Sequence, residues 1–129
     1  MTVFVDTSAL YSLLDHDDQD HARAALTWRR LVDEDADLLT NNYVLVEAAA
    51  LIQHRLGLAA VRALYQGLVP RLNIDWISEE AHLLAVEAVL VAARRGLSLV
   101  DCASFRTMRQ LATDTAFAFD KHFREQGFE

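Results

Sequence analysis

The sequence has few of the residues that cross-link a chain, break it into pieces or anchor it in a membrane. A single cysteine, Cys102, rules out an internal disulfide and agrees with a reducing compartment. One proline and four glycines in 129 residues leave no flexible linker, so we expect one domain over residues 1–129. No apolar run approaches the roughly 20 residues of a membrane span, and no basic leader precedes Val3. We therefore expect a cytoplasmic protein.

Positive charge is also scarce. Twelve basic residues, eleven of them arginine, face nineteen acidic ones and give a net charge of −7. A nonspecific nucleic-acid-binding protein would normally be basic. Arginine is nevertheless suited to bidentate phosphate contacts, and bound divalent cations would neutralise an acidic cluster. An acidic protein of this kind can still act on RNA if its charges are arranged locally.

Several common site motifs are missing. The chain has no glycine-rich phosphate loop and no G-x-S-x-G elbow, so nucleotide binding and serine hydrolysis have no support. The acidic loop 15–20 has Asp20 where a calcium loop needs glycine and Leu26 where it needs glutamate. No pair of histidines has the spacing of a zinc motif; they stand at His16, His21, His54, His82 and His122.

Short apolar runs alternate with stretches of helical periodicity along the whole chain. This alternation predicts an α/β fold, a three-layer α/β/α domain with a central parallel sheet of about four strands. The predicted strands are Val3–Val5, Leu38–Thr40, Leu72–Ile77 and Thr115–Phe119. The predicted helices are Ala9–Leu14, Gln19–Asp33, Tyr43–Leu56, Leu58–Val69, a helix from Glu79 that ends at Arg94-Arg95-Gly96, and Leu99–Leu111.

Polar residues stand at the predicted helix starts, where they can accept hydrogen bonds from free N–H groups. The candidate caps are Thr7 or Ser8, Asn41 or Asn42, Ser78 and Ser98. Gly57 is placed to end one helix and Pro70 to end the next. The apolar stretches 47–51, 58–68 and 88–93 are expected to be core helices, and any excess apolar surface on them would suit a protein partner.

Four carboxylates stand where an α/β fold would direct them to one place. Asp6 and Asp120 each end a predicted buried strand, and ligands of parallel sheets gather at the carboxyl ends of strands. Glu47 and Asp101 lie on the apolar stripes of two predicted helices, where a carboxylate needs a partner. Together the four carboxylates predict a divalent-metal site.

Each carboxylate also has an ordinary structural interpretation. Asp6 can be a solvated turn residue, and Asp120 can simply open the terminal turn. Asp101 completes the S-x-x-D pattern of a capping box that begins at Ser98. Glu47 is harder to explain structurally, because no lysine or arginine lies three or four residues away on its helix. The combined pattern favours the metal site more than any single member does.

Four segments of the sequence carry a resemblance to a known family. They are the opening Val3-Phe4-Val5-Asp6-Thr7-Ser8-Ala9-Leu10, then Thr40-Asn41-Asn42-Tyr43-Val44-Leu45-Val46-Glu47, then Leu97-Ser98-Leu99-Val100-Asp101-Cys102, and Phe119-Asp120-Lys121-His122-Phe123. In this order and spacing they resemble a PIN-domain ribonuclease over nearly the whole chain. Among PIN proteins the sequence is most similar to the small VapC-type toxins of toxin–antitoxin systems.

The resemblance implies a metal-dependent endoribonuclease. Asp6, Glu47, Asp101 and Asp120 would be the acidic quartet that holds Mg²⁺ or Mn²⁺, and the hydroxyl of Thr7 or Ser8 would lie near the metal or phosphate. Metal-activated water would hydrolyse RNA and leave a 5′-phosphate and a 3′-hydroxyl. The implied partners are the RNA substrate, a cognate antitoxin lying in an apolar groove, and a second copy in a homodimer. Arginines are candidates to guide the RNA backbone: Arg94, Arg95, Arg106 and Arg109.

Other interpretations of an acidic α/β domain fit less well. A response-regulator receiver needs an aspartate at the tip of its third strand, where this chain has Trp76-Ile77-Ser78. A haloacid-dehalogenase-type phosphatase needs a D-x-D arrangement, and this chain has Asp6-Thr7-Ser8. A PIN fold used for RNA maturation, or as an inactive RNA- or protein-binding scaffold, stays open as an alternative to the toxin.

Overall fold

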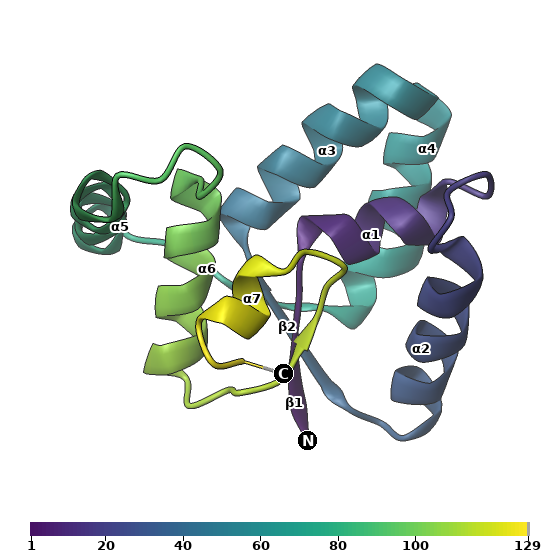
Figure 1. Cartoon of the computed structure of the whole chain (residues 1–129). Coiled ribbons are helices and arrows are strands. Elements are labelled where there is room, and N and C mark those ends of the chain that lie inside the picture. The colour runs from purple at the N-terminus through teal and green to yellow at the C-terminus, as the bar shows by residue number, and fades with distance from the viewer. Residues whose placement is uncertain (129) are drawn as a thin grey trace.

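A four-stranded parallel sheet forms the centre of the protein, as the alternating pattern predicted (Figure 1). The computed structural model describes residues 1–128. The strands are β1 (Thr2–Val5), β2 (Asp37–Asn41), β3 (Asn73–Asp75) and β4 (Ala116–Phe117), in the spatial order β3-β2-β1-β4. The register places Phe4 beside Leu39 on one side and Val5 beside Phe117 on the other. All four strands therefore end at the same edge of the sheet.

Helices cover both faces of this sheet, which confirms the predicted three-layer α/β/α fold (Figure 1). One layer contains α1 (Thr7–Leu14), α2 (His21–Asp33), α3 (Asn42–Leu56) and α4 (Leu58–Ala63). The opposite layer contains α5 (Glu79–Ala92), α6 (Leu99–Gln110) and the short α7 (His122–Glu125). Right-handed crossovers explain the division, because the chain moves from β1 through β2 to β3 and then returns across the sheet to β4.

Most helix starts agree with the sequence, and α1 is the exception. The Asp6 side chain accepts from the backbone N–H of Ser8 and so caps α1, which makes Thr7 and Ser8 helical residues and not the caps we predicted. Asn41 caps α3 with its Oδ1 2.8 Å from the backbone N of Val44. Ser78 and Ser98 cap α5 and α6 as predicted.

Two predicted helix ends are wrong. The helix from Glu79 stops at Ala92, where Ala93 adopts a left-handed φ of 51°, and does not continue to Gly96. The predicted helix 58–69 is α4 only to Ala63, followed by a π-helical turn (Leu64–Leu68) and a 3₁₀ turn (Val69–Arg71) that contains Pro70. The winding changes there because proline removes a backbone donor and cannot continue a regular helix.

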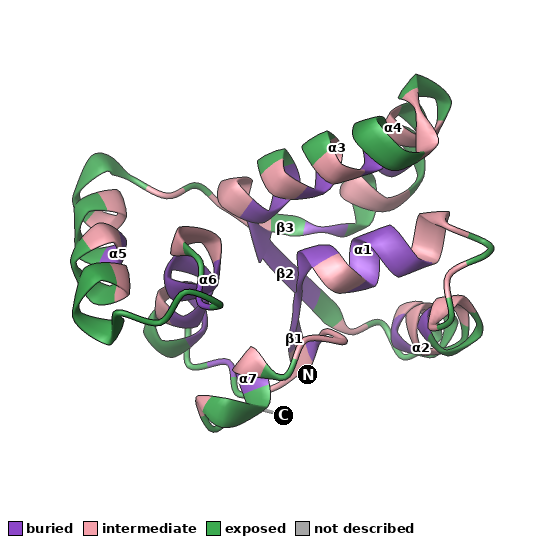
Figure 2. Cartoon of the chain, turned by 45° about the horizontal axis from the view of Figure 1, so that its top comes forward, coloured by how far each residue is buried: buried purple, intermediate pink, exposed green. Residues whose placement is uncertain are grey.

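The buried core surrounds β1 and the inner faces of α1, α3 and α6 (Figure 2). Phe4, Val44, Ile52 and Met108 are completely buried there. Phe123 of α7 also enters this core, with its ring centroid 5.9 Å from Phe4 and 5.2 Å from Phe105 of α6. The C-terminal turn is therefore attached to the centre of the fold by an aromatic contact.

Helix α5 contributes little more than Ala85 to that core, although its sequence is strongly apolar. Its Leu83, Leu84 and Leu90 are exposed, and Val91 is 80% exposed. Figure 2 shows α5 at the periphery, packed mainly on α6. The expectation that stretch 88–93 is core is therefore wrong, and stretch 58–68 similarly exposes Leu58 while burying Leu64. Within residues 1–128 no helix is both long and apolar enough to span a bilayer.

Candidate metal centre

Asp6 follows β1 and is almost completely buried, with 4% of its surface exposed. Its Oδ2 accepts hydrogen bonds from the backbone N of Ser8 at 3.4 Å and from the Ser8 Oγ at 3.1 Å. The same Oγ accepts from the backbone N of Phe119 at 2.9 Å, just beyond β4. Ser8 therefore connects the ends of two neighbouring strands through the carboxylate. Thr7 is buried beside it, and its Oγ1 has no hydrogen-bond partner among the described residues.

Burial changes the acidity of Asp6. Loss of solvation raises its pKa from 3.8 to about 7, and the negative charge of Asp101 adds to the rise. The hydrogen bonds from Thr7 and Ser8 act in the opposite direction but are outweighed. A carboxylate held so far from water is ionised at neutral pH only at a cost in free energy, unless a cation lies nearby.

Asp101 lies in the first turn of α6 and has two roles. Its Oδ2 accepts from the backbone N of Ser98 at 3.1 Å, while the Ser98 Oγ accepts from the backbone N of Asp101 at 3.0 Å, which is the predicted capping box. The same Oδ2 lies 3.3 Å from His122 Nδ1. The capping interpretation and the site interpretation of Asp101 are therefore compatible, because its carboxylate both caps α6 and faces the C-terminal turn.

Asp120 and His122 come from that turn. The backbone N of His122 donates to Asp120 Oδ1 at 2.7 Å, and His122 Nδ1 lies 2.9 Å from the same oxygen. The turn is held in place by Phe123, which packs between Phe4 and Phe105. An apolar anchor one residue beyond His122 thus brings two polar side chains back to the edge of the sheet. The sequence did not single out His122, because its only signal was its position two residues after Asp120.

Asp101, Asp120 and His122 offer three ligand atoms that all lie within 4.8 Å of one another. His122 Nδ1 is buried and, although it is close to two carboxylate oxygens, it makes no hydrogen bond of normal geometry with a described residue. A buried imidazole nitrogen facing two carboxylates fits a shared cation. Carboxylate ligands suit Mg²⁺ or Mn²⁺, and the imidazole favours a transition ion such as Mn²⁺ over Mg²⁺.

The four predicted carboxylates do not form one compact group in residues 1–128. Asp101 and Asp120 are brought together, and Asp6 is near enough for Asp101 to influence its pKa. Glu47 is half-buried on α3 and lies outside the compact group, so its predicted direction toward the core is only partly realised. Its role stays a prediction.

Within residues 1–128, none of the arginines suggested as RNA guides forms an ion pair with Asp101 or Asp120. Arg94 pairs with Glu125, with Nη2 3.0 Å from Oε2. Arg106 and Arg109 line a groove between α5 and α6, and Arg95 is exposed. Arg106 and Arg109 follow Asp101 by five and eight residues on α6. They therefore lie further along the helix and not at its first turn, where Asp101 is.

Polar side chains also end the two strands on the other side of β1. Asn41 ends β2, and its Nδ2 lies 3.3 Å from both Ser104 Oγ and Thr107 Oγ1 of α6. The Thr107 Oγ1 donates to Asp75 Oδ2 of β3 at 2.9 Å. These bonds fix α6 against the carboxyl edge of the sheet and so help to position Asp101.

A family model described as PIN domain matches residues 3–129. The chain is 32% identical over 127 residues to "23S rRNA-specific endonuclease VapC20" of Mycobacterium tuberculosis strain CDC 1551 / Oshkosh, covering 98% of this chain and 95% of that protein. The same protein of strain ATCC 25618 / H37Rv matches equally. The crystal structure of Mycobacterium tuberculosis VapC20, described as a sarcin-ricin loop cleaving toxin, superimposes with a TM-score of 0.85 at 29% identity over 98% of this chain and 96% of that one.

Proposed function

The chain belongs to the PIN-domain family, and on that premise we propose that it is a divalent-metal-dependent endoribonuclease that acts as the toxin of a toxin–antitoxin pair. The observation that carries the proposal is the group of the buried Asp101 with the half-buried Asp120 and His122, together with the buried Asp6. Carboxylates are expensive to bury close together with a single imidazole between them and no lysine or arginine paired to them, and a cation relieves that cost. Hydrolysis of a phosphodiester is a reaction that such a site can perform.

Each side chain has a part in the proposed reaction. Asp101, Asp120 and His122 would hold Mg²⁺ or Mn²⁺, with Asp6 and Glu47 adding negative charge nearby, and Ser8 fixes the direction of the Asp6 carboxylate. A divalent ion held there would supply Lewis-acid chemistry, since it would lower the pKa of a water molecule and stabilise negative charge on the phosphoryl group. The buried Thr7 hydroxyl has no hydrogen-bond partner within residues 1–128, and we propose that it lies near the metal or phosphate, as the family resemblance implies.

The proposed substrate is RNA presented as a single strand or an unpaired loop. The relatives named above cut 23S rRNA, and one is described as cleaving the sarcin-ricin loop. Proteins that recognise RNA by sequence usually read unpaired bases, because the major groove of an RNA helix is too deep and narrow for side chains. A structured loop of ribosomal RNA is therefore the first substrate to test, and the cytoplasm is the proposed place of action.

The central test is cleavage of end-labelled RNA by the purified protein with Mn²⁺, Mg²⁺ or EDTA, beside Asp6→Asn and Asp101→Asn. We expect cutting that needs the metal, leaves a 5′-phosphate, and falls about a hundredfold or more in both variants, because each removes a negative charge from the site. The matched control is Asp33→Asn, an exposed acid at the end of α2. Cutting that survives EDTA or both substitutions would contradict the proposal, and intact metal binding without cutting would favour a scaffold.

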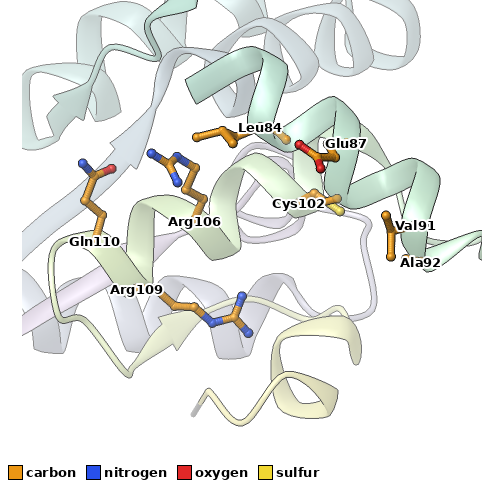
Figure 3. A pocket seen from close by; sticks show the side chains of 10 residues that line it. Leu84, Glu87, Val91, Ala92, Cys102, Arg106, Arg109 and Gln110 are labelled. Carbon is orange, nitrogen blue, oxygen red and sulfur yellow. The ribbon is translucent and has the colours of Figure 1, made fainter. Parts of the chain in front are cut away.

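The proposed protein partners are a cognate antitoxin and a second copy of the chain. Helix α5 exposes Leu83, Leu90 and Val91, and a groove of about 910 Å³ runs between α5 and α6. Figure 3 shows Leu84 and Val91 on one wall of this groove and Arg106 on α6 opposite them. A contiguous apolar surface with arginine at its border has the composition of a protein interface. We propose that the homodimer contact lies on α5. We also propose that a segment of the antitoxin lies in an apolar groove and blocks the metal site.

Replacing the exposed apolar residues of α5 should separate the dimer. Leu90→Glu combined with Val91→Glu puts charge on the proposed interface and should convert a dimer to a monomer in analytical ultracentrifugation without loss of helical circular dichroism. Leu26→Glu is the matched control, since Leu26 is about as exposed as Leu90 but lies on α2. A mass that changes equally in both proteins, or in neither, would remove α5 as the dimer contact.

A further inference from the structure

A second groove runs along the open edge of the sheet and begins at the metal cluster. It has a volume of about 550 Å³ and lies between the start of α2, the outer side of β4 and α7. Its lining includes Asp120, so the groove starts at one of the carboxylates of the candidate metal site. A smaller hollow of about 240 Å³ continues it along β4 and shares Arg23, Ala116 and Phe119 with it. The groove is therefore a path along β4 that ends at the proposed reaction centre.

Opposite charges balance in this groove although the protein as a whole is acidic: the lining carries Arg23, Lys121 and Arg124 against Asp20, Asp120 and Glu125. Its three acids each have a partner: Asp20 lies 3.6 Å from Arg23, Glu125 lies 3.0 Å from Arg94, and Asp120 contacts His122. Its two remaining cations, Lys121 and Arg124, are exposed and make no ion pair within residues 1–128. With the metal site occupied, the groove would present a net positive surface to an anionic chain.

An aromatic ring and a guanidinium form a flat surface in the same groove. The Cζ of Arg23 lies 5.3 Å from the centroid of Phe119, and the Arg23 side chain is 76% exposed. Phe119 is in turn fixed by an edge contact with Phe117 of β4, with centroids 6.1 Å apart. Unpaired RNA bases stack on aromatic rings and on guanidinium planes. A guanidinium held over a ring and open to solvent is such a surface, whereas a simple phosphate contact would not need the ring.

The backbone of β4 adds polar groups to the same wall. β4 is an edge strand whose only neighbour in the described sheet is β1, so its outer main-chain donors and acceptors are not used by another strand. They lie along the groove and can meet a ribose hydroxyl or the edge of a base. An extended acidic peptide could also use this edge, but the Arg23–Phe119 surface and the continuity with Asp120 favour RNA.

We propose that this groove holds an unpaired nucleotide next to the bond that is cut, with its base stacked on Arg23 over Phe119 and its phosphate bound by Lys121 and Arg124. The inference deepens the proposed nuclease function and rests on it. It makes Arg23 a specificity-determining residue that acts on the base, and Lys121 and Arg124 residues that act on the backbone. These two kinds of contact have different signatures in binding experiments.

The test measures binding of two fluorescein-labelled oligomers to the full chain carrying Asp101→Asn in Mg²⁺. One is single-stranded RNA of mixed sequence and about 12 nucleotides, and the other is an abasic ribose-phosphate chain of the same length. We expect Arg23→Lys, which keeps the charge, to reduce the preference for the base-containing oligomer by about fivefold or more. Lys121→Gln and Arg124→Gln should weaken the binding of both oligomers. Each substitution should also lower the slope of log Kd against log salt concentration by about 0.7.

Arg62→Gln, an exposed arginine on α4 outside the groove, is the control and should change neither quantity. An Arg23→Lys protein that keeps the full preference for bases would overturn the inference. The inference would also be overturned if poly-L-glutamate competed with the labelled RNA as well as unlabelled RNA does and this competition depended on Arg23. The groove would then be a site for an acidic peptide.

Cleavage of the same RNA by protein with Asp101 intact separates this inference from the nuclease proposal. If Arg23→Lys leaves the rate and the position of metal-dependent cutting unchanged, the nuclease proposal stands and the groove proposal is wrong. If base binding depends on Arg23 but no RNA is cut, the groove is an RNA-binding site and the nuclease proposal is wrong.

Discussion

The carboxyl edge of the sheet buries charged side chains, whereas α5, on the other side of α6, exposes leucine and valine. Asp6 is 4% exposed and Val91 is 80% exposed. Both regions reverse the usual distribution of side chains, and α6 lies between them: its first turn carries Asp101, and its other side forms the groove with α5. Buried charge and exposed apolar surface are more informative than the reverse, because each costs free energy that a binding partner can offset.

The two regions therefore differ in the kind of partner that each suits. A cation is complementary to the first, where two aspartates and a histidine converge. A second apolar protein surface is complementary to the other, where leucine and valine face solvent. The predictions below are ordered by the size of the expected effect, and each would sharpen or remove this contrast.

The largest effect on stability should come from comparing apolar residues on the two helices. Met108→Ala on α6 creates a cavity in the core and should lower the free energy of unfolding by about 2–5 kcal/mol. Val91→Ala on α5 should change it by no more than about 0.5 kcal/mol, since Val91 is already in solvent. Urea unfolding at a concentration at which the protein is monomeric gives both values. Similar losses for the two variants would mean that α5 is part of the core.

The next effect concerns the charge of Asp6 and depends on pH. Because the folded-state pKa is raised from 3.8 to about 7, folding favours the protonated form. This contribution is fully present below about pH 4 and is lost as pH rises to about 7. In EDTA, Asp6→Asn should therefore be more stable than the unchanged protein at pH 8, by roughly 1–3 kcal/mol, and similar to it at pH 4.

Thermal unfolding at both pH values, with and without Mn²⁺, measures this difference. Taking the difference between the two proteins cancels the titration of all other groups. Mn²⁺ should stabilise the unchanged protein more than the variant, because binding to the folded state adds stability that grows with the logarithm of the ratio of free ion concentration to Kd. A difference that does not vary between pH 4 and pH 8 would show that Asp6 is not ionised at a cost.

The smallest predicted effect is on metal preference. His122→Asn removes the imidazole while keeping a side chain that can accept a hydrogen bond, and it should weaken Mn²⁺ binding by about tenfold or more. Mg²⁺ binding should change less, because Mg²⁺ prefers oxygen ligands. Isothermal titration calorimetry with each ion gives the ratio of the two affinities, and the control is His54→Asn, which changes an exposed histidine on α3. An equal loss for both ions would make His122 a positioning residue for Asp120.

The sequence predicted the parts of this protein that depend on local pattern. The four strands, their parallel order and the capping box of Ser98 and Asp101 follow from short-range periodicity and cap chemistry. Asp6 and Asp120 could be placed at one edge because the ends of neighbouring parallel strands meet there. The sequence treated the cap and the site as alternatives for Asp101, and the structure shows that one carboxylate serves the cap and faces His122.

The parts that could not be predicted depend on packing between distant segments. His122 reaches Asp101 across the chain because Phe123 packs on Phe4 and Phe105, a contact that no local pattern encodes. The exposure of α5 was not predicted, because an apolar helix sequence indicates burial but does not say whether the helix is buried in its own chain or against a partner. Glu47 was placed on the apolar side of its helix, but half-burial on α3 left it outside the compact ligand group.

The pairing of β1 with β4 brings together the first and one of the last segments of the chain to be synthesised. Asp6 and Ser8 leave the ribosome early, but Phe119, which contacts Ser8, and the nearby Asp120 and His122 of the C-terminal turn follow more than a hundred residues later. Until then the first strand has only β2 beside it, and the contact from Phe119 to Ser8 is absent. Contacts of such long sequence separation form late, since closing the long intervening loop costs entropy. A nascent chain of this protein therefore cannot yet bring Asp120 and His122 to the candidate cation site, and the proposed nuclease would be inert while it is being made.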